Sequence, residues 1–342
     1  MKRKASVVIF QREPEGLDLS YEDMIGEWKR QLEMYPEIGS YKIIQMTAGE
    51  HPNDFKEEIG DADAVFGPVI YSDFLNEMMF VEHPNLKYVA TLDHGYEIFD
   101  KDMTRRHGVT ITNTIYGDWT IAQYAMALLL NICHDVSKHS DYVKNQYWLE
   151  RKKNSKINYE HLMCPQIELF DKRIGIVGLG NIGLCMAKMS AGMGMKVMAY
   201  SRTRKEGPVY DFIEQVSFED LLENSDVISI HCPLTEQTFR LFDKQAFGKM
   251  KSGVILINTA RGGIIDEDAL MDALNCRRVY KAGLDVISEE PPEYKIPLME
   301  SPYTYITPHI AWQPREARLR AIRLAVENYM SYLRGCPQNI IN

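Results

Sequence analysis

The chain has 342 residues, of which 39 are basic and 48 acidic, so its formal net charge is −9 at pH 7. A chain of this length usually forms about two domains, and its apolar share of 45% is enough for two cores, which excludes a wholly disordered protein. Phosphates are bound by clustered Lys and Arg, so the acidic balance argues against a nucleic-acid partner.

No segment of the sequence has the pattern of a membrane span or a secretory signal. The apolar run 5–10 is ended by Gln11-Arg12-Glu13, which suits a first strand better than a signal peptide. The longest apolar stretch, 125–132, is well below the ~20 residues that a span needs. Six scattered cysteines lack metal-ligand spacing. These features predict a cytoplasmic protein with reduced, mostly buried thiols, no membrane contact and no metal.

Short runs rich in β-branched residues alternate with helix-length segments along the chain. Alternation of this kind is typical of βαβ units and parallel sheets. The sequence therefore predicts the α/β class, with two Rossmann-like, doubly wound parallel-sheet domains in tandem. The predicted strands are 6–10, 41–46, 64–66, 87–91 and 110–113 in the first series, and 173–177, 196–200, 227–231, 254–258, 281–286 and 305–306 in the second.

The boundary between the two predicted domains is expected to be helical. Residues 119–138 are apolar over most of a helical surface, which predicts a buried helix. The segment 314–333 has a helical period and is expected to return to the first domain, making that domain discontinuous. A polar, weakly periodic stretch at 142–169 predicts an arm. The predicted bounds are 1–115 with 315–342 for the first domain, 116–314 for the second, and about 119–168 for the arm.

A glycine-rich loop, Gly178-Leu179-Gly180-Asn181-Ile182-Gly183, follows a predicted strand and opens a helix-like segment. In this context Gly178 permits a tight turn, Gly180 lets the backbone approach a pyrophosphate, and Gly183 allows close packing of helix on strand. The amides of Asn181 and Ile182 would lie at the helix N-terminus, where they favour phosphate. The loop predicts a dinucleotide cofactor.

The residues after the next strand, 196–200, bear on which dinucleotide is bound. An acid that accepts the ribose hydroxyls of NAD is expected there, but the sequence reads Ser201-Arg202-Thr203-Arg204-Lys205. Guanidinium and hydroxyl groups suit a 2′-phosphate. We therefore expect NADP(H) to be favoured over NAD(H), with Ser201, Arg202 and Thr203 as the contacts. The alternative is that Arg202 stacks on the adenine and the other cations are solvated.

Three predicted strands of the second domain end in polar residues. Arg261, Glu290 and His309 each follow one of these strands. Because the carboxyl ends of parallel strands line the ligand crevice of an open sheet, the three side chains are expected to form a site for a carboxylate substrate with proton transfer.

With these motifs the sequence resembles the D-isomer specific 2-hydroxyacid dehydrogenase family over nearly its whole length. The resemblance rests on the glycine loop, on 231–235 with Thr238, and on the segments around Arg261, Asp285, Glu290 and His309. Within the family it is most similar to glycerate dehydrogenases, also called hydroxypyruvate or glyoxylate reductases. The features shared with that subgroup are 121–123, 309–312 and 335–342.

The resemblance implies NAD(P)H-dependent reduction of a small 2-keto acid, with hydroxypyruvate or glyoxylate favoured, to the D-2-hydroxy acid. Arg261 would bind the substrate carboxylate. His309 would be the general acid and base, and Glu290 would orient the imidazole and stabilise its protonated form. These three residues are the predicted catalytic set.

The resemblance also implies further contacts and a homodimer that uses the arm. Pro233, Thr238 and Thr259 would contact the cofactor, and Asp285 would accept a hydrogen bond from the nicotinamide carboxamide. The substrate would meet the loop at His94 and Gly95, besides Arg261, His309 and Trp312. Asp93 and His94 depart from the family pattern, which leaves the choice of 2-keto acid open.

Two other functions are compatible with the same motifs. One is a dinucleotide-sensing binding protein like the family's transcriptional corepressors, which keep the catalytic trio. The other is a short phosphoglycerate dehydrogenase. A formate dehydrogenase is disfavoured because Glu290 stands where that enzyme carries Gln.

Overall fold

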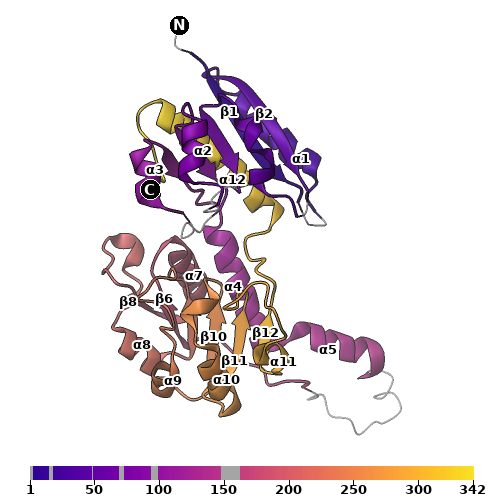
Figure 1. The fold of residues 1–342 in the computed structure, drawn as a ribbon. Helices are drawn as coiled ribbons and strands as arrows, with labels where there is room; N and C mark the ends of the chain where they lie inside the picture. Colours follow the sequence, from indigo (N-terminus) through magenta and orange to yellow (C-terminus); the bar gives the residue numbers. More distant parts are fainter. Residues whose placement is uncertain (1–2, 15–17, 48, 69–72, 94–98, 148–161) are drawn as a thin grey trace. The chain divides into compact units, whose positions relative to one another are not determined.

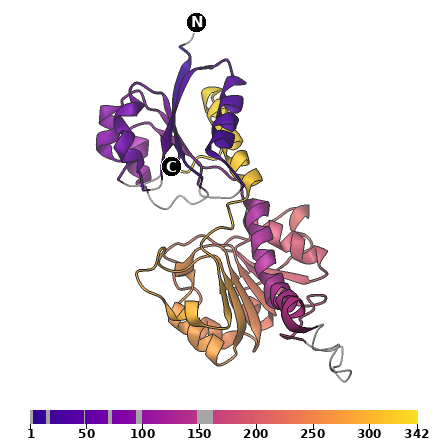
Figure 2. The ribbon, with the colours of Figure 1, turned by 90° about the vertical axis from the view of Figure 1, so that its right-hand side faces the viewer.

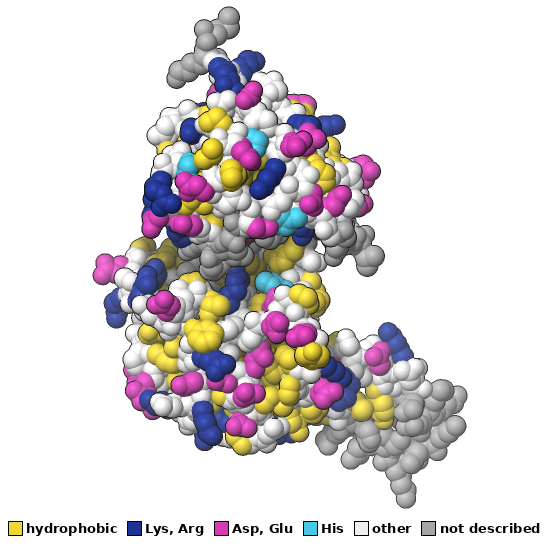
Figure 3. Space-filling model, viewed as in Figure 1, with side chains coloured by type: hydrophobic (Ala, Val, Ile, Leu, Met, Phe, Trp, Pro, Cys, Tyr) yellow, Lys and Arg dark blue, Asp and Glu magenta, His cyan; other side chains and the backbone are white. Residues whose placement is uncertain are grey.

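The computed structural model describes residues 3–14, 18–47, 49–68, 73–93, 99–147 and 162–342. The chain divides into two compact units, one formed by Met1–Gly117 with Gln313–Asn342 and the other by Asp118–Trp312. Each unit is built on its own parallel sheet, so the predicted α/β class is confirmed. On the face shown in Figure 3, acidic and basic side chains are interspersed over each unit.

The first unit is a five-stranded parallel sheet in the order β2-β1-β3-β4-β5. Its helices α1 and α12 cover one face, and α2 and α3 cover the other (Figures 1 and 2). The strands are β1 Ala5–Arg12, β2 Ile38–Met46, β3 Ala64–Gly67, β4 Tyr88–Thr91 and β5 Thr110–Thr112, and the helices are α1 Tyr21–Glu33, α2 Glu77–Glu82, α3 Lys101–Arg106 and α12 Arg315–Leu333.

The two cores of this unit follow from residues that alternate along its strands. Phe66 and Tyr88 face α12 and pack against Tyr329, with Phe66 and Tyr329 ring centroids 5.4 Å apart. Phe10 faces the other side and packs edge-on against Phe74. Helix α12, from the end of the chain, therefore completes a core whose other residues lie in the first unit's N-terminal part.

The second unit is a seven-stranded parallel sheet in the order β12-β11-β10-β9-β6-β7-β8. Helices α4 and α7 pack on one face, and α8, α9 and α10 pack on the other (Figure 2). The strands are β6 Arg173–Val177, β7 Lys196–Tyr200, β8 Glu214–Gln215, β9 Val227–Ile230, β10 Val254–Asn258, β11 Val279–Leu284 and β12 Thr304–Ile306, and the helices are α4 Asp118–His134, α5 Val136–Tyr142, α7 Asn181–Gly192, α8 Phe218–Asn224, α9 Lys244–Lys249, α10 Glu267–Asn275 and α11 Pro297–Glu300.

The strand order of this unit reverses at β6. Strand β7 lies on one side of β6 and β9 on the other, and ligands of such sheets bind where the order switches. Strand β10 is buried along its whole length, as expected of a central parallel strand with helices on both faces. The carboxyl ends of β9, β10, β11 and β12 lie side by side along the same edge.

Three expectations about local structure were wrong. The predicted helix 119–138 is broken, because Asp135 adopts a left-handed conformation (φ 43°) and its carboxylate caps α5. The short edge strand β8 was missed, since two residues carry too little alternation to detect. Cys133 and Cys185 are buried, but Cys276 and Cys336 are exposed, so burial of the thiols is less general than predicted.

In the described part of the chain, no helix is long and apolar enough to span a membrane.

Candidate active site

The glycine loop connects β6 to α7 and lies against the end of β9. Gly178 has φ +97°, and a Cβ there would lie 2.5 Å from the backbone nitrogen of Cys232. A Cβ on Gly183 would lie 2.0 Å from the carbonyl oxygen of Gly178, whereas Gly180 faces open space. Two of the glycines are therefore required by close packing, and the third leaves the loop surface accessible.

Several observations show that this edge fits a dinucleotide. Helix α7 begins at Asn181 and Ile182 with neither a side-chain cap nor an acid in its first turn, so its N-terminal amides can meet an anion. The hydroxyl of Thr259 is buried and has no hydrogen-bond partner among the described residues. Thr238 closes the neighbouring loop, since its hydroxyl donates to the carbonyl of Pro233 at 2.6 Å. Cys232 stays a thiol, because burial raises its pKa to about 11.

The segment after β7 presents cations to solvent. The hydroxyl of Ser201 donates to the carbonyl of Thr203 at 2.7 Å, and the backbone of Lys205 makes two 2.7 Å bonds with the Gln215 side chain. Arg202, Thr203 and Arg204 are exposed. The guanidinium groups of Arg202 and Arg204 form no ion pair with another described residue. The loop is thus fixed at its base while its charges remain available to an anion.

The imidazole of His309 is paired with the carboxylate of Glu290. The Nδ1 atom of His309 lies 2.6 Å from Oε2 of Glu290, and the backbone N–H of Ile287 donates to Oε1 at 2.8 Å. Burial alone raises the pKa of Glu290, but the bonds from His309 and Ile287 and the charge of Arg261 outweigh it, so this pKa lies below its usual value. Glu290 therefore stays ionised beside the imidazole.

The backbone of His309 is held in a left-handed conformation with φ +54°, which is uncommon for a residue with a Cβ. Its N–H donates to the carbonyl of Asp285 at 2.9 Å, and its carbonyl accepts from Nε1 of Trp312 at 2.8 Å. These two bonds hold the backbone of His309 in this conformation, and the imidazole is held by its contact with Glu290.

Asp285 organises the loop that carries His309. The residue is 1% exposed. Oδ1 accepts from the hydroxyl of Thr307 at 2.6 Å and from the N–H of Ile310 at 3.0 Å, and Oδ2 accepts from the N–H of Ala311 at 2.9 Å. Oδ1 thus accepts two hydrogen bonds and Oδ2 one from the described residues, and a carboxylate oxygen can accept two.

Arg261 is brought to the same edge by the turn after β10. The side chain of Asn258 bonds both the carbonyl of Arg261 and the N–H of Ala260. A Cβ on Gly262 would lie 1.9 Å from the carbonyl carbon of Ile287. The absence of a side chain at Gly262 lets the two turns that carry Arg261 and Glu290 pack backbone to backbone.

The structure thus brings Arg261, Glu290 and His309 to the ends of the three neighbouring strands β10, β11 and β12. Trp312 is placed beside His309 by its bond to the backbone, and His94 and Gly95 lie outside the described residues. Sequence reasoning missed Gly262, Thr307 and Glu267. The last of these accepts a hydrogen bond from the N–H of Ser288, in the turn before Glu290, at 2.7 Å. Glu267 is recognisable in the sequence only as one of three successive acids at a helix start, a pattern that ordinary capping explains.

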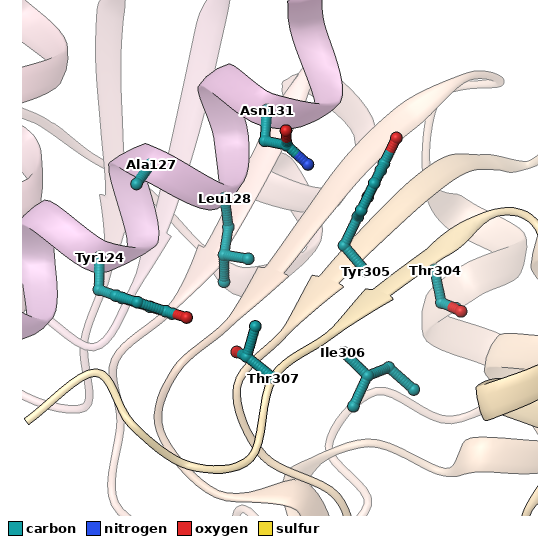
Figure 4. A pocket seen from close by; sticks show the side chains of 8 residues that line it. All are labelled: Tyr124, Ala127, Leu128, Asn131, Thr304, Tyr305, Ile306 and Thr307. Atoms are coloured by element: carbon teal, nitrogen blue, oxygen red, sulfur yellow. The ribbon is translucent and has the colours of Figure 1, made fainter. Parts of the chain in front are cut away.

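A separate cavity of about 440 Å³ lies between α4 and β12 (Figure 4). It contains none of the three predicted catalytic side chains, but Thr307, which bonds Asp285, forms part of its wall. Among the described residues no group of three or more His, Cys, Asp or Glu is placed to hold a metal ion.

The fold and this edge of the sheet define a dinucleotide-dependent oxidoreductase. The family described as D-isomer specific 2-hydroxyacid dehydrogenase, NAD binding domain, matches residues 126–311. The hydroxypyruvate reductase of Blautia hydrogenotrophica is 38% identical over 306 residues, which are 89% of this chain and 92% of that protein. The glyoxylate reductase of Thermococcus litoralis is 35% identical over 84% of this chain and 85% of that protein.

A solved structure has a similar fold. The TT0316 protein from Thermus thermophilus has a TM-score of 0.79 and 29% identity, over 98% of this chain and all of that one. The chain belongs to the D-isomer specific 2-hydroxyacid dehydrogenase family. It is an oxidoreductase that acts on the CH–OH group of 2-hydroxy acids with NAD(P).

Proposed function

We propose that the protein reduces a small 2-keto acid, with hydroxypyruvate or glyoxylate favoured, to the D-2-hydroxy acid, and that it prefers NADPH to NADH. The observation that carries this proposal is the 2.6 Å pair of His309 and Glu290. The two residues follow β12 and β11, and Arg261 follows β10, the strand next to β11. A paired imidazole beside a guanidinium supplies both a proton and an anion site.

His309 is the proposed general acid and base. Its Nδ1 faces Glu290, so Nδ1 carries a proton that is donated to the carboxylate, and Nε2 is the nitrogen that exchanges a proton with substrate. During reduction Nε2–H protonates the developing alkoxide, and during oxidation Nε2 accepts the hydroxyl proton. The ionised Glu290 stabilises the imidazolium.

Arg261 is the proposed carboxylate-binding residue. Its guanidinium is planar with several donors, which matches a carboxylate in two parallel hydrogen bonds. The Asn258 bonds and the Gly262 contact hold its backbone in place, so the substrate carboxylate would be bound in a fixed direction relative to His309.

The cofactor is proposed to lie along the edge from β7 to β11. Gly178, Gly180, Gly183, Asn181 and Ile182 would hold the pyrophosphate, with Ser201, Arg202 and Thr203 on the 2′-phosphate. Pro233, Thr238, Thr259 and Asp285 would hold the remainder. When bound, the nicotinamide supplies the hydride, and the protein contributes position and charge. The buried, unpaired hydroxyl of Thr259 supports this assignment.

The first unit is the proposed substrate domain and the second the proposed cofactor domain, with His94, Gly95 and Trp312 as further substrate contacts. We also propose a homodimer that uses the arm, of which 148–161 lie outside the described residues. Light scattering of the purified protein tests the dimer, because a monomeric mass would contradict it.

The test of the proposed function is steady-state oxidation of NADPH and NADH with hydroxypyruvate, glyoxylate, pyruvate and a branched 2-keto acid. Turnover of the first two acids with NADPH at a higher kcat/KM than with NADH is the expected result. Preference for the branched acid would keep the reaction and reject the substrate. Dinucleotide binding without turnover of any acid would favour a sensing protein, and oxidation of 3-phosphoglycerate alone would favour a phosphoglycerate dehydrogenase.

A further inference from the structure

We infer that Glu267 is a positioning residue for proton transfer, because its carboxylate holds the turn that presents Glu290 to His309. Glu267 lies in the first turn of α10, on a different element from both members of the pair. The inference rests on the proposed roles of His309 and Glu290.

Two acids hold consecutive amides of the same turn. The N–H of Ile287 donates to Oε1 of Glu290 at 2.8 Å, and the N–H of Ser288 donates to Oε1 of Glu267 at 2.7 Å. Oε2 of Glu290 is the atom bonded to His309. The position of the Glu290 carboxylate is therefore set by a turn that Glu267 anchors from outside, through a charge-assisted bond.

The helix itself does not account for the direction of this side chain. Asp266 is the cap of α10 and accepts from the N–H of Ala269 at 3.1 Å. Asp268, also in the first turn, is exposed and supplies a negative charge near the helix dipole. Glu267 instead bonds a residue 21 positions away in sequence.

The turn is supported on a second side by the backbone. The contact at Gly262, where a Cβ would lie 2.4 Å from the backbone nitrogen of Ser288, places that turn against the one that follows Arg261. Van der Waals contact restricts how close the turns approach, whereas the directional bond to Glu267 selects the orientation of the Ser288 amide. Loss of Glu267 is thus expected to loosen Glu290 without moving Arg261.

Four variants test this inference. Glu267→Ala removes the acceptor, Glu267→Gln keeps an acceptor oxygen without the charge, and Asp268→Ala is the matched control because it removes an acid from the same helical turn. Glu290→Gln provides the background for a double-mutant cycle. We expect Glu267→Ala to lower kcat by about 10-fold with less than about a threefold change in the KM of the keto acid.

Glu267→Gln should recover part of that loss, and Asp268→Ala should retain the wild-type kcat. In the Glu290→Gln background, Glu267→Ala should lower kcat by less than about threefold, because its effect passes through Glu290. A decrease in kcat of about 10-fold or more in that background, as large as in the wild type, would overturn the inference. A wild-type kcat in the single variant Glu267→Ala would also overturn it.

A second readout separates this inference from the proposed function. The imidazole Cε1–H resonance of His309, identified by its loss in His309→Gln, is compared at one pH among the variants. It should move toward its Glu290→Gln position in Glu267→Ala and stay in place in Asp268→Ala. An unmoved resonance in Glu267→Ala would reject the positioning role. The proposed function is rejected by a different result, namely that the wild-type protein reduces no 2-keto acid, and the resonance can be measured in either case.

Discussion

The hydroxyl of Thr307 donates to Oδ1 of the buried Asp285 at 2.6 Å, joining the ends of β12 and β11. The same carboxylate accepts from the amides of Ile310 and Ala311, which follow His309 in the chain. A buried carboxylate must be satisfied by donors of this kind. Here the donors that satisfy it belong to the loop that carries the proposed proton donor.

Thr307→Val removes one of these donors at nearly constant volume. Because a hydrogen bond to a charged group contributes about 1.5–3 kcal/mol, we expect a lower thermal midpoint together with a lower kcat. Thr304→Val is the control. Thr304 lies in β12, the strand that Thr307 follows, and its hydroxyl donates to the carbonyls of Leu298 and Ser301. It should reduce the midpoint but not kcat. Equal decreases in kcat in the two variants would argue against the idea that the bond from Thr307 to Asp285 helps to position the loop that carries His309.

His309→Gln keeps a polar side chain but removes the group that exchanges protons. General acid–base catalysis contributes about 10²–10⁴-fold, so kcat should fall by that factor. Binding of NADPH, measured by fluorescence titration, should be unchanged because His309 is not among the proposed cofactor contacts. A variant with more than about a tenth of the wild-type kcat would contradict the assignment of His309.

Arg261→Lys keeps the positive charge but loses the planar pair of donors. A single ammonium cannot reproduce two parallel bonds to a carboxylate, so we expect the KM of the keto acid to rise by about 10- to 100-fold, equivalent to about 1.4–2.8 kcal/mol. Steady-state kinetics at saturating NADPH measure this effect. An unchanged KM would place the substrate carboxylate elsewhere.

Arg202→Ala tests the cofactor preference. If the guanidinium binds the 2′-phosphate, its loss should weaken NADPH binding by about 10- to 100-fold, which corresponds to about 1.4–2.8 kcal/mol from charged hydrogen bonds. The affinity for NADH, which lacks the phosphate, serves as the internal control and should change little. Equal losses for the two dinucleotides would support stacking of Arg202 on the adenine instead.

His231→Gln tests how burial of an imidazole affects acid stability. Burial lowers the pKa of His231 to about 3, below the ~6.5 of an unfolded chain. The unfolded state therefore takes up a proton that the folded state excludes, and stability is lost as pH falls from about 6.5 toward 3. Between pH 7 and pH 5 this loss is about 2 kcal/mol.

The variant should lose less stability than the wild type over that interval. Thermal midpoints at pH 7 and pH 5 give the comparison, and parallel decreases in the two proteins would show that His231 is not responsible.

Local sequence was sufficient for the parallel-sheet class and for the strands and turns on which the proposed site is built. Strand β6, the glycines after it and helix α7 are consecutive in the chain, so their spacing already predicts a dinucleotide loop. Arg261, Glu290 and His309 were predicted to lie at one edge of the sheet because each follows an apolar strand, and the structure places them there. These are short-range patterns, and the physics behind them is the periodicity of strands and the geometry of turns.

The tertiary structure alone decided which distant groups meet. Glu267 bonds Ser288, and Gly262 admits the backbone of Ile287. Both pairings exist because the sheet orders β10, β11 and β12 as neighbours. The break at Asp135 was also hidden, since the composition on either side favours a helix and the reversal lies in the backbone conformation of one residue. Contacts between segments far apart in sequence depend on strand order, which no local pattern encodes.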